Sequence, residues 1–387
     1  MDSHLFVKPA GQLVQTPQGH EAFIPAPLPR YLELTPSLLA LLSRADRSIG
    51  ELMGMARMLP NQQLLIAPLT QRESVLSSQI EGTQASVADL AIFEASGEIA
   101  LSPHLDVREV RNYRRALNYG IDRLSTFPLS LRFVRELHHE LLHDTLGQDK
   151  TPGEFRSIQN WIGAPGCEID EATYVPPPPT QLMTCLSDWE AFVHDEGPLP
   201  TLIKCALLHY QFEAIHPFVD GNGRVGRLLL LIYLLDRKYI STPIFYLSPF
   251  FARHRDSYYS LLRGITERSE WEEWIEFFLR GVIVQSRDGL KRTENLIELQ
   301  QKYRERLQRA SRSVQRLLDL LFSTPAITVS NAALRLDVTW VTANSAISLL
   351  VDRGILREVT GQRRDRVFLA QEIVDTINQE LSESSLD

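Results

Sequence analysis

The chain of 387 residues has few cysteines and no long apolar run. Its three cysteines, Cys167, Cys185 and Cys205, lack CxxC spacing, which argues against a disulfide framework and against a zinc site. The longest apolar run, residues 228–235, has eight residues, far fewer than a membrane span needs. At the N-terminus no basic region leads into an apolar stretch, so no secretory signal is visible. We therefore expect a protein of the reducing cytoplasm with no membrane partner.

A strong excess of positive charge is also missing. The formal net charge is −8 at neutral pH, which excludes a protein that coats nucleic acid over its whole surface. The charge is uneven, because residues 371–387 carry five acids and no base. We expect this acidic tail to lie in solvent.

Apolar residues recur every three to four positions along most of the chain, a pattern typical of helices. Residues 1 to about 34 are rich in Pro and Gly and predict an extended arm. Residues 160–179 contain four consecutive prolines, which predicts a loop or a short hairpin. A loop this long is often functional, although a surface excursion without a role stays open. The predicted helices cover about 37–59, 68–80, 86–95, 106–124, 130–145, 180–195, 200–215, 223–238, 248–266 and 271–308.

The pattern changes after residue 325. Two short helices, 328–336 and 341–352, are separated by a turn and followed by a two-strand pattern around Gly361. This order is typical of a winged helix-turn-helix. Three arginines within residues 363–366 suit contacts with DNA phosphates, but the second helix has no Lys or Arg. DNA binding and a protein-docking or dimer-forming role therefore both stay open.

The segment from His216 to Arg227 reads His-Pro-Phe-Val-Asp-Gly-Asn-Gly-Arg-Val-Gly-Arg. An apolar helix ends at the histidine, and three glycines precede or open the next apolar helix. Free N–H groups and the helix dipole at such an N-terminus favour an anion. Glycines at 221 and 223 permit positive φ and the close approach of a phosphate.

The charged residues of this segment suit a polyphosphate that carries Mg²⁺. Arg224 and Arg227 lie three residues apart on one helical face and would hold phosphate oxygens. Asp220 would bind the metal. His216 is the nearby group that can accept a proton near neutral pH. Together these residues predict attack of a hydroxyl on a phosphorus atom.

Residues 216–227 resemble the Fic motif at every defining position: His, any, Phe, any, Asp or Glu, Gly, Asn, Gly or Lys, Arg, two of any, Arg. The resemblance extends over about residues 35–290 and includes the segments 151–156 and 174–179. It implies an all-α Fic helical fold with a small β-hairpin flap. It also implies transfer of AMP from ATP to Ser, Thr or Tyr hydroxyls of target proteins and of the enzyme itself.

The resemblance also implies the roles of individual residues. His216 would be the general base, Asp220 the Mg²⁺ ligand and Phe218 a buried anchor. The loop 160–179 would be the flap that aligns a target segment by strand pairing. Gly223, where kinase-type members carry Lys, favours transfer of AMP over transfer of phosphate. The ATP-binding residues would be Gly221, Asn222, Gly223, Arg224, Val225, Gly226, Arg227 and, beside the adenine, Tyr259.

Residues 77–82, Ser-Ser-Gln-Ile-Glu-Gly, resemble the Fic inhibitory motif of the class whose inhibitory helix is N-terminal. Ser77 and Glu81 lie on one face near a helix C-terminus, where a carboxylate is unfavourable without a cationic partner. We expect Arg227 to be that partner, which would keep it from the γ-phosphate of ATP. Two alternatives stay open: Glu81 is an ordinary surface acid, or it positions water for the removal of AMP.

The sequence thus predicts five segments and leaves several functions open. The runner-up functions are a DNA-binding transcriptional regulator with a Fic sensor and a Fic enzyme that removes AMP. A homodimer also stays open. The segments are an N-terminal arm and helical region with the inhibitory helix (1–110), a Fic catalytic core (111–290), a linker helix (291–312), a winged helix-turn-helix (313–370) and the acidic tail (371–387).

Overall fold

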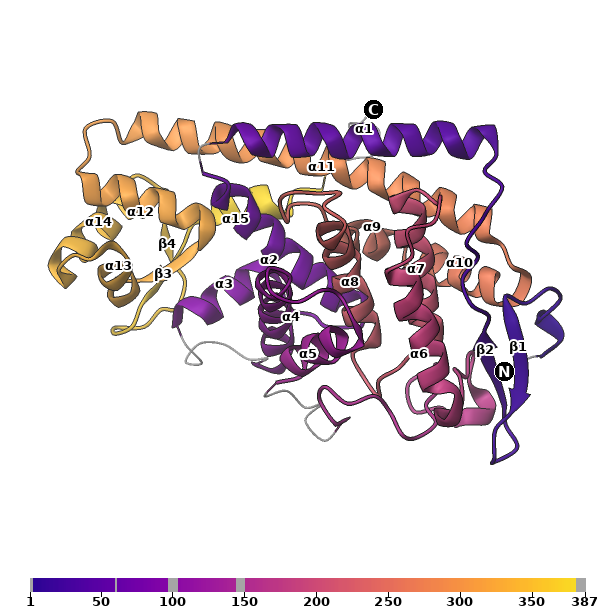
Figure 1. The fold of residues 1–387 in the computed structure, drawn as a ribbon. Helices are drawn as coiled ribbons and strands as arrows, with labels where there is room; N and C mark the ends of the chain where they lie inside the picture. Colours follow the sequence, from indigo (N-terminus) through magenta and orange to yellow (C-terminus); the bar gives the residue numbers. More distant parts are fainter. Residues whose placement is uncertain (1–2, 60, 97–103, 144–149, 381–387) are drawn as a thin grey trace. The chain divides into compact units, whose positions relative to one another are not determined.

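The computed structural model describes residues 3–59, 61–96, 104–143 and 150–380. The protein is mostly helical, as expected, and has two small sheets (Figure 1). The end of the helix predicted at 130–145 and residues 381–387 of the tail lie partly or wholly outside the described residues. No helix in the described part of the chain is both long and apolar enough to cross a membrane.

Internal contacts divide the chain into two compact units. The first comprises residues 1–47, 115–241 and 250–283, and the second comprises 48–114, 242–249 and 284–387. Four helices contribute residues to both units: α1 (Pro36–Met58), α4 (His104–Arg123), α9 (Ser248–Arg253) and α11 (Trp271–Arg306).

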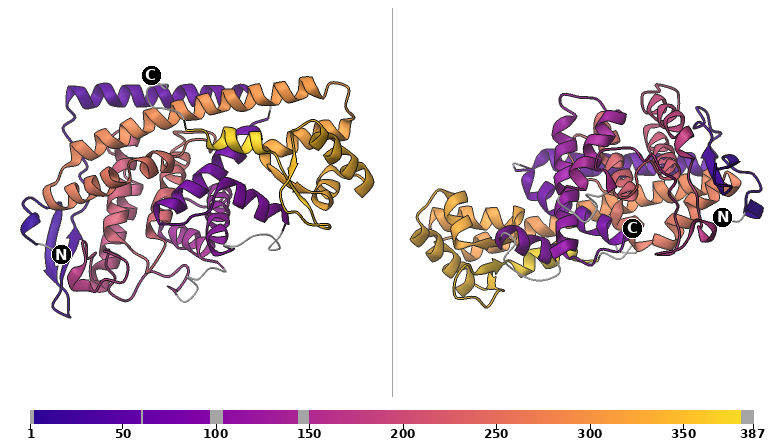
Figure 2. Two further views of the ribbon diagram at one scale, coloured as in Figure 1. Left: turned by 180° about the vertical axis from the view of Figure 1, so that it is seen from behind. Right: turned by 90° about the horizontal axis from the view of Figure 1, so that it is seen from below.

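The first unit is built around α7 (Thr201–Ile215) and α8 (Asn222–Asp236), which pack side by side (Figures 1 and 2). Nearly every residue of α7 is buried, as expected for a helix that is apolar all round. The two helices approach closely at Gly226, where an added Cβ would lie 3.2 Å from Phe212 Cδ1. The other helices of this unit are α5 (Leu131–Leu141), α6 (Pro179–Val193) and α10 (Arg255–Arg268).

The expectation of an extended arm over residues 1–34 is wrong in part. β1 (Gly11–Gln15) and β2 (Glu21–Pro25) form an antiparallel hairpin, preceded by the short helix η1 (Ser3–Leu5). An isolated two-stranded hairpin is marginally stable, but this one packs against the flap (Figure 2). The Phe23 N–H donates to Val175 O over 2.9 Å. That partner is about 150 residues away, so local periodicity gave no sign of the strands.

Most of the predicted helices are confirmed, with three differences. α2 (Gln63–Ile80) begins at Gln63 rather than at Pro68, which lies inside it. The helix expected at 248–266 is two helices, α9 and α10, separated at His254. α12 (Arg312–Ser323) was not predicted. The remaining short helices are α3 (Val87–Ser96) and η3 (Ile169–Glu171).

The C-terminal part of the second unit contains a three-stranded antiparallel sheet in the order β3-β5-β4 (Figure 1). Thr328 and Thr339 cap the two helices, each accepting a backbone N–H at its side-chain oxygen. This is the order of elements expected for a winged helix-turn-helix; membership of that class and DNA binding stay predictions. The elements are β3 (Ala326–Thr328), α13 (Val329–Leu336), α14 (Trp340–Asp352), β4 (Arg357–Glu358) and β5 (Val367–Leu369).

The expectation that the tail lies in solvent from its first residue is wrong. Residues Gln371–Asn378 form α15, whose Ile373, Val374 and Ile377 are buried. Arg292, 1 % exposed, donates to the carbonyls of residues 376, 377 and 379 at the end of this helix. The acidic composition of residues 371–387 gave no indication of this short apolar face. The end of the helix also depends on α11, which supplies Arg292.

Arg292 also pairs with Asp288 over 2.8 Å inside the second unit, and Asp288 accepts in addition from Arg72. We expect Arg292→Met to lower the free energy of unfolding by about 3 kcal/mol, because it leaves buried acceptors unsatisfied. Denaturant unfolding measures this. Arg304→Met, which removes an exposed pair with Asp319, should change it by less than about 1 kcal/mol. Equal losses in the two variants would contradict this account.

Candidate functional site

The turn between α7 and α8 reverses the chain within a few residues. His216, the C-cap of α7, has φ 49° and ψ 62°, and Gly221, the N-cap of α8, has φ 77°. Left-handed backbone is unfavourable for a non-glycine residue by about 1–2 kcal/mol. At Gly221 an added Cβ would also lie 3.3 Å from Leu141 Cδ2. The turn therefore requires glycine at 221 and holds a histidine in a strained conformation at 216.

Phe218 and Asn222 fix the inside of this turn. Asn222 Oδ1 accepts from the Phe218 N–H, and Asn222 Nδ2 donates to Phe218 O, both over 2.8 Å. The Phe218 ring is fully buried, as the resemblance implied, and stacks on His138 with centroids 3.7 Å apart. These contacts fix the conformation of the turn.

One ring nitrogen of His216 has a defined partner. His216 Nδ1 lies 3.3 Å from Glu213 O. A carbonyl oxygen can only accept, so in the neutral ring Nδ1 carries the hydrogen and Nε2 carries the lone pair. This tautomer presents Nε2 as the basic nitrogen.

Asp220 lies among positive groups at the start of α8. Its Oδ2 is 2.9 Å from Lys150 Nζ, and its Oδ1 is 3.7 Å from Arg224 and accepts from the Gly221 N–H. Burial acts to raise the pKa of the Asp220 carboxyl, but these partners together hold the pKa below its ordinary value. The carboxylate is therefore ionised at neutral pH and already has a cation beside it.

The two arginines of the motif project from the first turns of α8. Arg224 is 5 % exposed and Arg227 is 3 % exposed. Cations at a helix N-terminus are unfavourable against the helix dipole, and burial adds a desolvation cost. An anion bound at this N-terminus would relieve both costs. Among the other predicted ATP-binding residues, Val225 is fully buried in the core.

Three predicted residues lie outside the segment 216–227 in the sequence. Tyr259, on α10, is 37 % exposed, with the Arg255 guanidinium 5.3 Å from its ring centroid. Ser77 is buried in α2, and Glu81 is the exposed C-cap of α2. Both α2 residues belong to the second unit and Arg227 to the first. The adenine contact of Tyr259 and the pairing of Glu81 with Arg227 stay predictions.

Sequence reasoning missed four residues that contact the turn: His138, Lys150, Arg156 and Asn160. Arg156 belongs to the segment 151–156 that carried the resemblance, and this was the one signal of its importance. The other three show no spacing relative to His216, because they reach the turn only through the fold.

His138 is held as a neutral imidazole under the turn. The Gly153 N–H donates to His138 Nδ1 over 2.8 Å, so the ring hydrogen is on Nε2 and is donated to Asp220 O over 3.0 Å. Burial lowers the pKa of His138 to about 4. The ring thus stays neutral at physiological pH and fixes the peptide of the predicted metal ligand.

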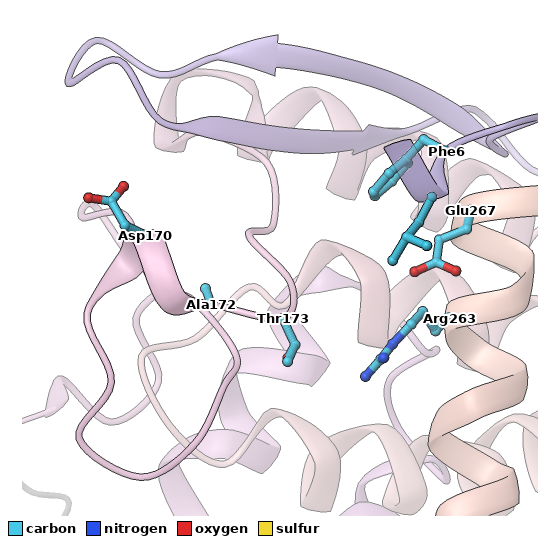
Figure 3. Close-up of a pocket in the computed structure, with 7 residues that line it drawn as sticks. Phe6, Asp170, Ala172, Thr173, Arg263 and Glu267 are labelled. Atoms are coloured by element: carbon cyan, nitrogen blue, oxygen red, sulfur yellow. The ribbon is translucent and has the colours of Figure 1, made fainter. Parts of the chain in front are cut away.

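The flap lies beside a cavity of about 380 Å³ in the first unit (Figure 3). The limbs of the flap are joined by an antiparallel bridge between Ile162 and Tyr174. Arg263 points from α10 across the cavity toward Thr173 of the flap (Figure 3). No other described residue pairs with Arg263, whereas Glu267 of the same cavity pairs with Arg268. The cavity therefore presents the Arg263 guanidinium next to the flap.

The fold and the turn define a helical protein in which two buried arginines lie at a helix N-terminus and a histidine lies at the edge of the turn. Residues 39–122 match the family described as Fic/DOC family N-terminal, and residues 128–234 match the Fic/DOC family. The chain belongs to the Fic/DOC family.

Curated relatives match part of the chain. A protein adenylyltransferase Fic of Drosophila grimshawi is 33% identical over 113 residues, which cover 29% of this chain and 21% of the relative. A probable protein adenylyltransferase of Aquifex aeolicus is 33% identical over 96 residues, 25% of this chain and 28% of the relative. The match thus spans only about a fifth to a quarter of these relatives' length.

Solved structures agree with the fold. A Fic family protein from Desulfovibrio desulfuricans superposes with a TM-score of 0.58 at 17% identity, covering 89% of this chain and 98% of that one. Fic-1 from C. elegans superposes with a TM-score of 0.51 at 17% identity, covering 67% and 74%. These likenesses establish the Fic fold.

The low pKa of His138 has a consequence for stability. In the unfolded chain His138 gains a proton as the pH falls below its ordinary pKa of 6.5, whereas in the folded protein it gains this proton only near pH 4. The free energy of unfolding should therefore fall as pH drops through this window, with His138 contributing about 3 kcal/mol. His138→Gln keeps a donor toward Asp220 O and should show a smaller fall in denaturant unfolding between pH 7 and pH 4.5. His139→Gln, on the exposed side of α5, should keep the wild-type slope; an unchanged slope in His138→Gln would refute this account.

Proposed function

We propose that the protein is a protein adenylyltransferase that transfers AMP from ATP to a Ser, Thr or Tyr hydroxyl of a target protein and of itself. The observation that supports this most directly is the turn from His216 to Arg227. It combines a basic ring nitrogen, an ionised carboxylate, a helix N-terminus and two buried arginines. Each is suited to the transfer of a phosphorus group.

The proposed transfer replaces one bond of the α-phosphorus by another. The hydroxyl oxygen of the target attacks the α-phosphorus, and its proton moves to Nε2 of His216. The bond between the α-phosphorus and the oxygen that bridges to the β-phosphorus breaks, and pyrophosphate leaves. Arg224 and Arg227 hold the β- and γ-phosphates, and the backbone of residues 221–223 donates to phosphate oxygens. Tyr259 would lie beside the adenine.

The residues present fit a Mg²⁺ ion held by Asp220. In the described part of the chain, no three His, Cys, Asp or Glu residues lie together as a metal cluster. Mg²⁺ is commonly bound by one or two carboxylates together with substrate phosphates. When bound, the metal would neutralise charge on the leaving pyrophosphate. The ion pair of Asp220 with the Lys150 ammonium supports this proposal, because a cation is already placed beside the carboxylate.

The flap 160–179 is the proposed docking site for the target segment. Its exposed Trp161 and Ile162 and the adjoining cavity with Arg263 offer apolar and charged contacts to a peptide. The names of the curated relatives support the same reaction, within the part of their length that matches. Gly223 in place of Lys supports AMP transfer rather than phosphate transfer.

We further propose that the protein inhibits itself through Glu81, which would pair with Arg227 and withhold it from the γ-phosphate. The position of Glu81 at the C-cap of α2 supports this, because a carboxylate there is unfavourable without a cation. The alternative is that Glu81 positions water for the removal of AMP, and labelling experiments with Glu81→Gly distinguish the two roles.

The reaction can be tested by intact-mass spectrometry after incubation with ATP and Mg²⁺. The mass should rise by one AMP, because the enzyme supplies its own hydroxyl acceptor. In His216→Ala the rate of this gain should fall about a hundredfold or more, since the general base is lost. His139→Ala, a surface histidine of the same unit, should retain the wild-type rate. A gain of phosphate instead of AMP would contradict the proposed reaction.

The inhibition can be tested by labelling with α-phosphate-labelled ATP. Glu81→Gly should increase self-labelling about tenfold, as expected when a coupling of one to two kcal/mol is removed. Glu33→Gly, a change at an exposed acid outside α2, should have no effect. If labelling equals that of the wild type in Glu81→Gly, the brake does not exist. If AMP already attached to the protein is released faster from the wild type than from Glu81→Gly, Glu81 takes part in the removal of AMP.

A further inference from the structure

Arg156 is a buried cation whose side-chain hydrogen bonds in the described part of the chain go to main-chain carbonyls. It is 3 % exposed, and among the described residues no carboxylate lies within ion-pair distance of it. Burial lowers the pKa of its guanidinium to about 10, so it remains charged at neutral pH. A buried charge persists only where other groups satisfy it. Here those groups are backbone carbonyls.

The four acceptors of the guanidinium come from two places in the fold. Nη1 donates to Ile158 O over 3.2 Å and Nη2 to Pro177 O over 2.6 Å, one at each base of the flap. Nε donates to His216 O over 2.9 Å, and Nη2 donates to Ile215 O over 3.4 Å. One planar side chain therefore joins both ends of the flap to the end of α7.

The backbone and a neighbouring amide extend the same connection. The Arg156 N–H donates to Pro217 O over 2.9 Å. Asn160 Nδ2, at the start of the flap, donates to Phe218 O over 2.9 Å. Carbonyls on both sides of the left-handed His216 are thus held by donors from residues 156–160. A strained residue persists where its surroundings over-determine it, and these donors supply that constraint.

We infer that Arg156 is a positioning residue that fixes the catalytic histidine relative to the flap, so that the hydroxyl presented by a docked target meets Nε2 of His216. This inference rests on the proposed function. Within the described residues, each hydrogen bond of the guanidinium goes to a main-chain carbonyl at the ends of the flap or at the junction of α7 with the turn. Arg156 therefore acts on the transfer step and not on the binding of ATP.

The two steps can be measured separately. The first-order rate of self-labelling at saturating ATP reports transfer, and calorimetric titration with a non-transferable α,β-methylene analogue reports binding. In Arg156→Ala the rate should fall about a hundredfold, as expected for a misplacement of about 1 Å. The dissociation constant of the analogue should change less than about threefold.

A purely structural role is separated by chemical rescue and by a matched control. Ethylguanidinium added to Arg156→Ala should restore part of the rate, whereas ethylammonium should not, because the planar fork is what reaches the carbonyls. Arg156→Lys, which keeps the charge, should remain slow for the same reason. Lys204→Met removes another buried cation of this unit, one that contacts Asp195, and should lower thermal stability without changing the rate.

The inference is overturned if folded Arg156→Ala or Arg156→Lys labels at the wild-type rate. It is also overturned if transfer and analogue binding weaken by equal factors without rescue by ethylguanidinium. If Arg156→Ala does not fold, the labelling rate and the analogue affinity of Arg156→Lys test the inference instead. Absence of self-labelling in both wild-type and Glu81→Gly protein is a different result: it removes the proposed function and the inference that rests on it.

Discussion

The site depends on one constraint: α7 and α8 must be joined by a turn that places two residues in left-handed conformations. Both residues adopt the left-handed conformation, which costs no free energy at Gly221 but is unfavourable at His216. The buried Phe218 ring, the two Asn222 hydrogen bonds and the Arg156 guanidinium hold the histidine in place. The same turn directs the N-terminus of α8, with its two arginines, to one location. Loss of the turn would therefore separate His216 from the N-terminus of α8.

The local part of this arrangement could be predicted from the sequence. The spacing of His216, Asp220, Gly221, Arg224 and Arg227 falls within twelve consecutive residues, where the turn alone brings them together. Most helices were also predictable, because their apolar periodicity is a local property. The mostly helical Fic fold agrees with the expectation, and one antiparallel bridge joins the limbs of the flap.

What could not be predicted depends on contacts distant in sequence. The β1–β2 hairpin is stabilised by Val175, α15 by Arg292 and the turn itself by His138 and Arg156. None of these residues has a spacing that links it to its partner, and from the sequence alone the polar side chains of Arg292, His138 and Arg156 resemble those of surface residues. Burial turned them into structural groups, as the lowered pKa values of His138 and Arg156 show.

The hairpin at the N-terminus has a practical consequence for anyone who shortens the chain. The family matches begin at residue 39, so a fragment cut to that boundary would lack both strands. It would expose the apolar surface of Ala172 and Val175 and leave the Val175 carbonyl without the Phe23 N–H. Exposed strand edges of this kind favour aggregation. Measurements on a trimmed fragment would thus describe a flap that no longer packs against the β1–β2 hairpin.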